Sequence, residues 1–124
     1  MTTKQVNKMG FGSLRVNKVN DDMAEVFVYG DIGGWMDGVS ADEFARELKS
    51  LKVTDITARI NSGGGSVFEG QAIYNSLVNH PAKVNVIIDG IAASIASVIA
   101  MSGDTISITE GSHIMVHKPW SIAM

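Results

Sequence analysis

The chain has 124 residues, the size of one domain or part of one, and its 45% hydrophobic and 19% charged content is that of an ordinary globular core. Its net charge of −3, without a basic cluster, argues against a nucleic-acid-binding or anionic-membrane surface. The absence of cysteine excludes disulfides, a thiolate nucleophile and cysteine metal sites, and it fits a cytoplasmic location.

The first half of the chain alternates strand and helix patterns. Residues 1–22 are polar, lack the apolar core of a signal peptide, and are predicted to form an N-terminal arm or a weak edge strand. Residues 24–30 read as a strand, and a glycine-rich loop follows at 31–39. Ser40 and Glu43 then form a capping box, which begins a helix because each residue can satisfy a free backbone donor of the other.

The second half continues this alternation. Residues 55–60 are predicted as a strand, and a second capping box, Ser66 with Glu69, begins a helix that ends before Pro81. The remaining elements are predicted as a strand at 84–88, a small-residue helix at 92–102, and short strands at about 105–109 and 113–118. The longest uncharged stretch, 90–103, is shorter than the ~20 apolar residues that span a bilayer, so we expect a buried helix and no membrane span.

The order of these elements predicts an α/β fold, in which parallel strands are joined by right-handed crossovers. No repeat or low-complexity segment interrupts the pattern. We therefore expect residues 23–124 to form one domain, preceded by the arm at 1–22.

Ser94 is the candidate nucleophile. It stands in Gly90-Ile-Ala-Ala-Ser-Ile-Ala-Ser97, directly after a predicted strand and a sharp turn, where its side chain would be presented at the carboxyl edge of the sheet. The dipole of the following helix would favour negative charge at that place. Ser97 lies one turn deeper and is expected to pack. The small residues in this run would equally allow close packing of a helix on a strand, so the pattern alone leaves both interpretations open.

The glycine turn Asn61-Ser-Gly-Gly-Gly65 is the second candidate feature. Glycine can turn its backbone N–H groups toward an oxyanion without hindrance from a Cβ atom, and losing one such donor costs roughly 3 kcal/mol. The same turn could be a connection without a ligand, or a phosphate-binding loop. Phe68-Glu69-Gly70 stands where a Walker motif needs Gly-Lys-Ser/Thr, which argues against nucleotide binding.

The histidines supply the third feature. His80 precedes a proline and is expected at the surface, at a helix end. His113 and His117 lie four residues apart in a predicted strand, which places them about 13 Å from each other, too far to share a metal ion. We therefore predict no metal site. His117, at the carboxyl end of its strand, is better placed to meet Ser94, and the three features together point to nucleophilic acyl transfer.

With these motifs, the chain resembles the Clp protease proteolytic subunit family, serine peptidases with a crotonase-like fold of repeated β-β-α and βα units. The resemblance extends from about Glu25 to Trp120. It rests on Ile60-Asn-Ser-Gly-Gly-Gly-Ser-Val67, on Ala92-Ala-Ser94 and on Ile114-Met-Val-His-Lys-Pro119, and the last glycine of the turn precedes the serine by 94 − 65 = 29 positions. Residues 68–75 and 89–94 resemble the phage-encoded branch, which processes capsid proteins during head maturation.

The resemblance implies a role for each matching position. Ser94 would be the nucleophile, His117 its general base, and the backbone amides of Gly65 and Ile95 the oxyanion hole. No cofactor is implied. The implied substrate is a protein or peptide, the implied assembly is a homo-oligomeric ring of seven subunits, and an ATP-dependent unfoldase is left open as a partner. Gly63 departs from the family, which usually has proline there, and this should loosen the turn by about 0.4–1 kcal/mol.

The acid of the catalytic triad is unassigned. In the family it comes well after the histidine, together with a ring-joining helix, and Asp31, Asp37, Asp89 and Asp104 do not match its position. The sequence ends at Met124, seven residues after His117 and on an apolar segment, so we expect a chain truncated at its C-terminus, with the acid beyond Met124. Disabling the aspartate of serine proteases lowers turnover roughly 10⁴-fold, so we expect weak or no activity. The alternatives are an acyl-CoA-binding crotonase-fold enzyme and a non-catalytic assembly protein.

Overall fold

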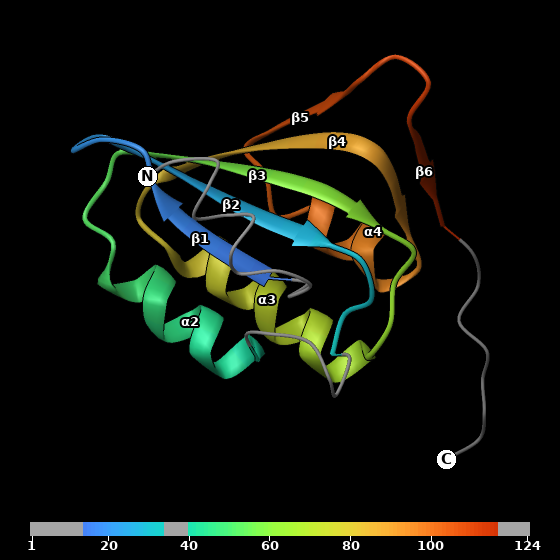
Figure 1. Cartoon of the computed structure of the whole chain (residues 1–124), viewed down its shortest axis with the longest axis horizontal. Coiled ribbons are helices and arrows are strands. Elements are labelled where there is room, and N and C mark those ends of the chain that lie inside the picture. The colour runs from blue at the N-terminus through green and yellow to red at the C-terminus, as the bar shows by residue number, and fades with distance from the viewer. Residues whose placement is uncertain (1–13, 34–39, 117–124) are drawn as a thin grey trace.

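The computed structural model describes residues 14–33 and 40–116, and its strands form one sheet in the order β1-β2-β3-β4-β5 (Figure 1). The edge strand β1 runs antiparallel to β2, whereas β2, β3, β4 and β5 are parallel. A short strand, β6, pairs in parallel with the last residues of β4. The strands are β1 (Leu14–Lys18), β2 (Met23–Tyr29), β3 (Asp55–Ser62), β4 (Lys83–Ala93), β5 (Thr105–Ile108) and β6 (His113–Met115). The predicted α/β class is confirmed.

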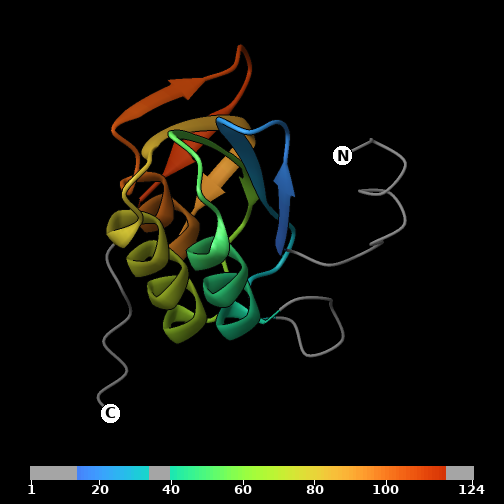
Figure 2. The ribbon, with the colours of Figure 1, turned by 90° about the vertical axis from the view of Figure 1, so that its left-hand side faces the viewer.

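The described helices cover one face of the sheet, as the two perpendicular views show (Figures 1 and 2). They are α2 (Ala41–Ser50), α3 (Val67–Asn79) and α4 (Ile95–Ala100). Alternate strand residues point into this layer and are fully buried, among them Val26, Ile60 and Val86, where they pack with Phe44 and Leu48 of α2. The intervening strand residues lie on the opposite face of the sheet and are half-buried.

Both helix starts carry the predicted serine caps. The hydroxyl of Ser40 accepts a hydrogen bond from the Glu43 N–H at 3.2 Å, and that of Ser66 accepts one from the Glu69 N–H at 3.2 Å. The reciprocal half of the second box was predicted wrongly. The Ser66 N–H already donates to a backbone carbonyl, that of Ile32, at 2.9 Å. The Glu69 carboxylate is therefore free to accept from the N–H of Ala41, at 3.1 Å, and ties α3 to the start of α2.

The end of β4 differs most from the sequence prediction. The predicted strand 84–88 and helix 92–102 are observed as a strand that continues to Ala93 and a helix of six residues. Ala92 pairs with Ile114 of β6 and with Ser62 of β3. These tertiary pairings outweigh the helix preference of alanine, which is only a weak local term.

Candidate active site

Ser94 is the single residue between β4 and α4, and its backbone is strained. With φ 59° and ψ −130°, it is the one non-glycine residue with positive φ in the described ranges. Such a conformation costs about 1–3 kcal/mol and persists only where neighbouring structure holds it. Its N–H donates to the Met115 carbonyl of β6 at 3.2 Å. Its hydroxyl makes no capping bond to α4, which leaves the oxygen available for chemistry.

Ser97, the other serine of the small-residue run, is differently engaged. Its side chain is 3% exposed, and its hydroxyl donates to the Ser94 carbonyl at 2.6 Å. Its N–H donates to the same carbonyl at 3.0 Å. Ser97 therefore supports the backbone of Ser94 from inside the helix.

The glycine turn lies directly against Ser94. A Cβ atom added to Gly64 would be 2.7 Å from the Cβ of Ser94 and 3.3 Å from its hydroxyl oxygen, so only a hydrogen fits there. Gly64 also has φ +110°, which disfavours any other residue. The buried hydroxyl of Ser62 holds the turn, because it donates to the Gly30 carbonyl at 2.6 Å and accepts from the Gly64 N–H at 3.1 Å.

Within residues 14–33 and 40–116, no acceptor is found for the backbone N–H of Gly65 or of Ile95. Ile32 bonds the turn on either side of Gly65: its N–H donates to the Gly64 carbonyl at 3.0 Å, and its carbonyl accepts from the Ser66 N–H at 2.9 Å. These two bonds fix the backbone on both sides of the Gly65 N–H. Ile95 is the first residue of α4, and such N–H groups have no acceptor within their helix.

The predicted base, His117, lies outside the described residues. Asp37 also lies outside them, and so does Met124, the residue beyond which the triad acid is expected. The other histidine of that segment, His113, is exposed on β6. Within residues 14–33 and 40–116, no three His, Asp or Glu side chains gather as metal ligands would.

His80, predicted at a helix end on the surface, is the half-buried C-cap of α3. Its Nδ1 accepts from the Ala82 N–H at 3.0 Å, so its Nε2 carries the proton and donates to the Leu51 carbonyl at 3.1 Å. Leu51 is the C-cap of α2. His80 therefore ties the end of α3 to the end of α2.

A polar network behind the site was not anticipated from the sequence. The two carboxylate oxygens of Asp89 accept from the Arg59 guanidinium at 2.7 Å and from the Tyr29 hydroxyl at 2.5 Å. Arg59 also donates to Glu25 at 3.0 Å, and this bond raises the pKa of Arg59. Desolvation by burial, followed by the bond to Asp89, raises the pKa of Tyr29 to about 12. The signal was present, since polar residues stand at alternate positions on the same face of three neighbouring strands.

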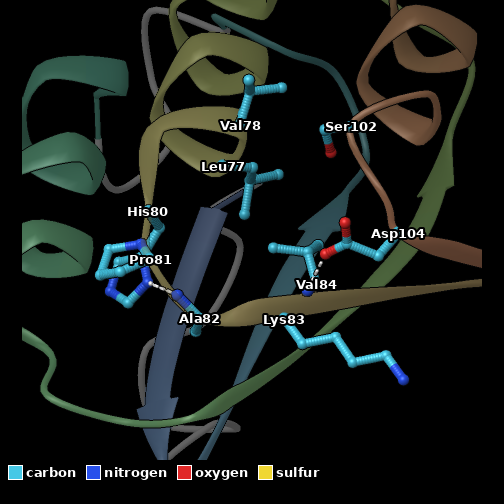
Figure 3. A pocket seen from close by; sticks show the side chains of 9 residues that line it. All are labelled: Leu77, Val78, His80, Pro81, Ala82, Lys83, Val84, Ser102 and Asp104. Atoms are coloured by element: carbon cyan, nitrogen blue, oxygen red, sulfur yellow. Dashed lines mark hydrogen bonds between the residues drawn. The ribbon is translucent and has the colours of Figure 1, made fainter.

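A cavity of about 540 Å³ lies far from Ser94, where α3 ends and β4 begins (Figure 3). Its lining mixes apolar and polar residues, with Val84 beside the carboxylate of Asp104, while the Lys83 side chain extends away from the others. Asp104 is already engaged, because it accepts from the Val84 N–H at 2.8 Å. The cavity therefore lies at the amino end of β4, whereas Ser94 and the glycine turn lie at the carboxyl end of that strand.

Comparison with known proteins identifies relatives of this arrangement. A model of the Clp protease family matches residues 16–124. The chain is 36% identical over 109 residues to the ATP-dependent Clp protease proteolytic subunit of Ligilactobacillus salivarius, an alignment that covers 82% of this chain and 46% of that protein. The chain thus spans about half the length of this curated relative.

Solved structures share the fold. The ClpP protease catalytic domain from Plasmodium falciparum superposes with a TM-score of 0.59 at 27% identity, covering 96% of this chain and 62% of that one. An enoyl-CoA hydratase from Polaromonas sp. JS666 gives a TM-score of 0.60 at 9% identity, covering 83% of this chain and 50% of that one. At that identity the likeness concerns the fold alone. The expected crotonase-like architecture is confirmed.

Proposed function

The chain belongs to the Clp protease family, and on that premise we propose that it is a serine-type endopeptidase that hydrolyses peptide bonds through an acyl-enzyme on Ser94. The observation that carries the proposal is the strained serine held against the glycine turn. The Ser94 hydroxyl makes no capping bond to α4, and Gly64 lies against Ser94 so closely that no side chain fits between them. We assign the activity to the domain 23–124, to which the preceding segment adds the edge strand β1.

The proposed mechanism assigns one step to each group. The hydroxyl oxygen of Ser94 attacks the scissile carbonyl carbon while His117 accepts its proton. The N–H groups of Gly65 and Ile95 stabilise the negative charge on the former carbonyl oxygen. The amine leaves with the proton from His117. Water then attacks the acyl carbon while His117 accepts its proton, and His117 returns that proton to the Ser94 oxygen as the carboxylic acid product leaves.

The third member of the triad remains unassigned. Asp89 is occupied by Tyr29 and Arg59, and Asp104 by a backbone N–H at the far end of β4. Asp31 is exposed in the loop that follows β2. None of the three contacts Ser94 through a bond found in the described part of the chain. We therefore leave the acid unassigned and give the proton transfer to Ser94 and His117 alone.

We also propose that the substrate is a protein or peptide and that the chain assembles into a homo-oligomeric ring of seven. Apolar side chains at Val98, Met101, Ile106 and Ile108 are 38–52% exposed on α4 and on the edge strand β5, which supports association. The motifs at 68–75 and 89–94 support placing the chain in the phage-encoded branch, with capsid protein as substrate. The described helices include none long and apolar enough to cross a bilayer.

Labelling with a fluorophosphonate probe tests the proposed chemistry. We expect the 124-residue chain to be modified at Ser94, slowly because no triad acid is assigned in it, and we expect Ser94→Ala to abolish the modification. Ser107→Ala is the matched control, because it removes an exposed serine hydroxyl on β5, outside the contacts that hold Ser94, and should leave labelling at Ser94 intact. The absence of modification in the folded chain, or modification at Ser97, would contradict the proposal.

A further inference from the structure

We infer that Asp89, Tyr29, Arg59 and Asn61 are positioning residues for Ser94, because they hold a two-residue insertion in β4 that brings the serine opposite the glycine turn. The inference deepens the proposed function and rests on it for its catalytic consequence. The insertion itself and the contacts that hold it are geometric observations, which stand independently of the reaction.

The insertion lies in the segment 89–91 of β4, three residues that stand opposite the single residue Asn61 of β3. Ile60 pairs with Ile88, but Ser62 pairs with Ala92, so β4 advances four residues while β3 advances two. Without the two extra residues, Ser62 would pair with Gly90. The residue opposite Gly64 would then precede Ser94 by two positions, a displacement of about 7 Å at ~3.3 Å per residue. Because two is an even number, the insertion moves the serine along the strand without turning it to the other face.

The first residue of the insertion is held by side chains from two other strands. The Asp89 carboxylate binds Tyr29 of β2 through one oxygen and Arg59 of β3 through the other, at 2.5 and 2.7 Å. Arg59 is itself fixed by Glu25, at 3.0 Å. The Arg59 and Asp89 side chains are only 33% and 18% exposed, so water competes little with these charge-assisted bonds.

The end of the insertion is held by Asn61, the residue opposite it. The side-chain oxygen of Asn61 accepts from the Ile91 N–H at 3.2 Å, which satisfies a backbone donor that the interrupted ladder leaves free. A Cβ atom on Gly90 would be 2.4 Å from the same oxygen, so glycine is required for this contact. Both ends of the insertion are thus fixed from β3, and Ser94 follows three residues after Ile91.

The comparison of Asp89→Ala with Asp104→Ala tests the inference. Each change removes a carboxylate that fixes β4, but Asp104 holds the Val84 N–H at the amino end of the strand, away from Ser94. In Asp89→Ala, we expect the maximal rate of fluorophosphonate labelling to fall at least tenfold, because displacements of about 1 Å can cost 10²-fold. The probe concentration at half-maximal rate should change less than twofold, since the glycine turn is retained. In Asp104→Ala, both quantities should match the parent chain.

Hydrogen exchange gives the second readout. Asp89→Ala should speed exchange of the amides of residues 91–94 and leave those of 84–88 unchanged. Labelling of Asp89→Ala at the parent rate, or an equal fall in both variants, would overturn the inference. If the parent chain is never labelled, the proposed function fails, whereas the exchange comparison still decides the positioning: unchanged exchange at 91–94 would overturn it.

Discussion

Replacing Gly64 by alanine should displace Ser94 and destabilise the fold. The added Cβ would be 2.7 Å from the Ser94 Cβ and 3.1 Å from the Ala93 carbonyl oxygen. Ordinary contacts are about 3.5–4.0 Å, so one segment must move by roughly 1 Å, and neither contact is the end of a flexible side chain. Alanine at φ +110° adds backbone strain of about 1–3 kcal/mol, and overpacking adds about 1–3 kcal/mol. We expect a total loss of roughly 2–6 kcal/mol.

Gly63→Ala is the matched control, one residue away in the same turn. A Cβ at Gly63 would meet no heavy atom within 4 Å, and its φ lies outside the left-handed region. This change should alter the free energy of unfolding by less than about 1 kcal/mol, in the stabilising direction. Urea denaturation measures the stabilities, and the rate of fluorophosphonate labelling reports on Ser94. The reasoning is refuted if Gly64→Ala keeps the parent urea midpoint and labelling rate.

Three further predictions concern strain, titration and capping. Ser94→Gly should be more stable to urea than Ser94→Ala by about 1–3 kcal/mol, because glycine adopts φ 59° without strain; equal midpoints would show that the conformation is unstrained. The stabilising bond of Tyr29 should be pH-independent below pH 10 and be lost between pH 10 and about 12, since the unfolded chain loses the phenol proton first. The stability difference between the parent and Tyr29→Phe should therefore fall over that range, and a constant difference would contradict this. Glu69→Ala should lower the free energy of unfolding by about 0.5–2 kcal/mol, because Ala41 loses its cap. Glu47→Ala, on the exposed face of α2, should change the free energy of unfolding by no more than about 0.5 kcal/mol. Equal losses in the two variants would contradict the capping role.

Local patterns predicted much of this fold because the forces behind them are local. The caps at Ser40 and Ser66 involve a donor three residues away, and both were found as predicted. The alternation of buried residues in β2 and β3 likewise follows from the two-residue period of a strand. The sharp turn before Ser94 was predicted at Gly90, which was wrong, because β4 continues through Gly90 to Ala93 and Ser94 itself separates β4 from α4.

The features that aim Ser94 could not be predicted because they depend on distant partners. Ala92 and Ala93 read as helical until the pairing with β6 is known. The two-residue register shift is decided by contacts between three strands, and nothing in the local sequence of β4 specifies it. The prediction that Glu69 caps its own helix was wrong for the same reason, because the N–H that bonds its carboxylate belongs to another helix, 28 residues away along the chain.

The backbone of Ser94 is fixed from three directions, and this explains how its strain persists. Its N–H is bound by Met115 of β6, its carbonyl receives both donors of Ser97, and Gly64 blocks movement of its side chain toward β3. A strained conformation survives only where the surroundings over-determine it, so relaxing any one of these contacts should let φ return to negative values. The contact from β6 is the weakest of them, because that strand has three residues and, among the described strands, pairs with β4 alone. The orientation of the serine therefore depends on a strand whose own stability is low, and conditions that release β6 should inactivate Ser94 before the rest of the sheet unfolds.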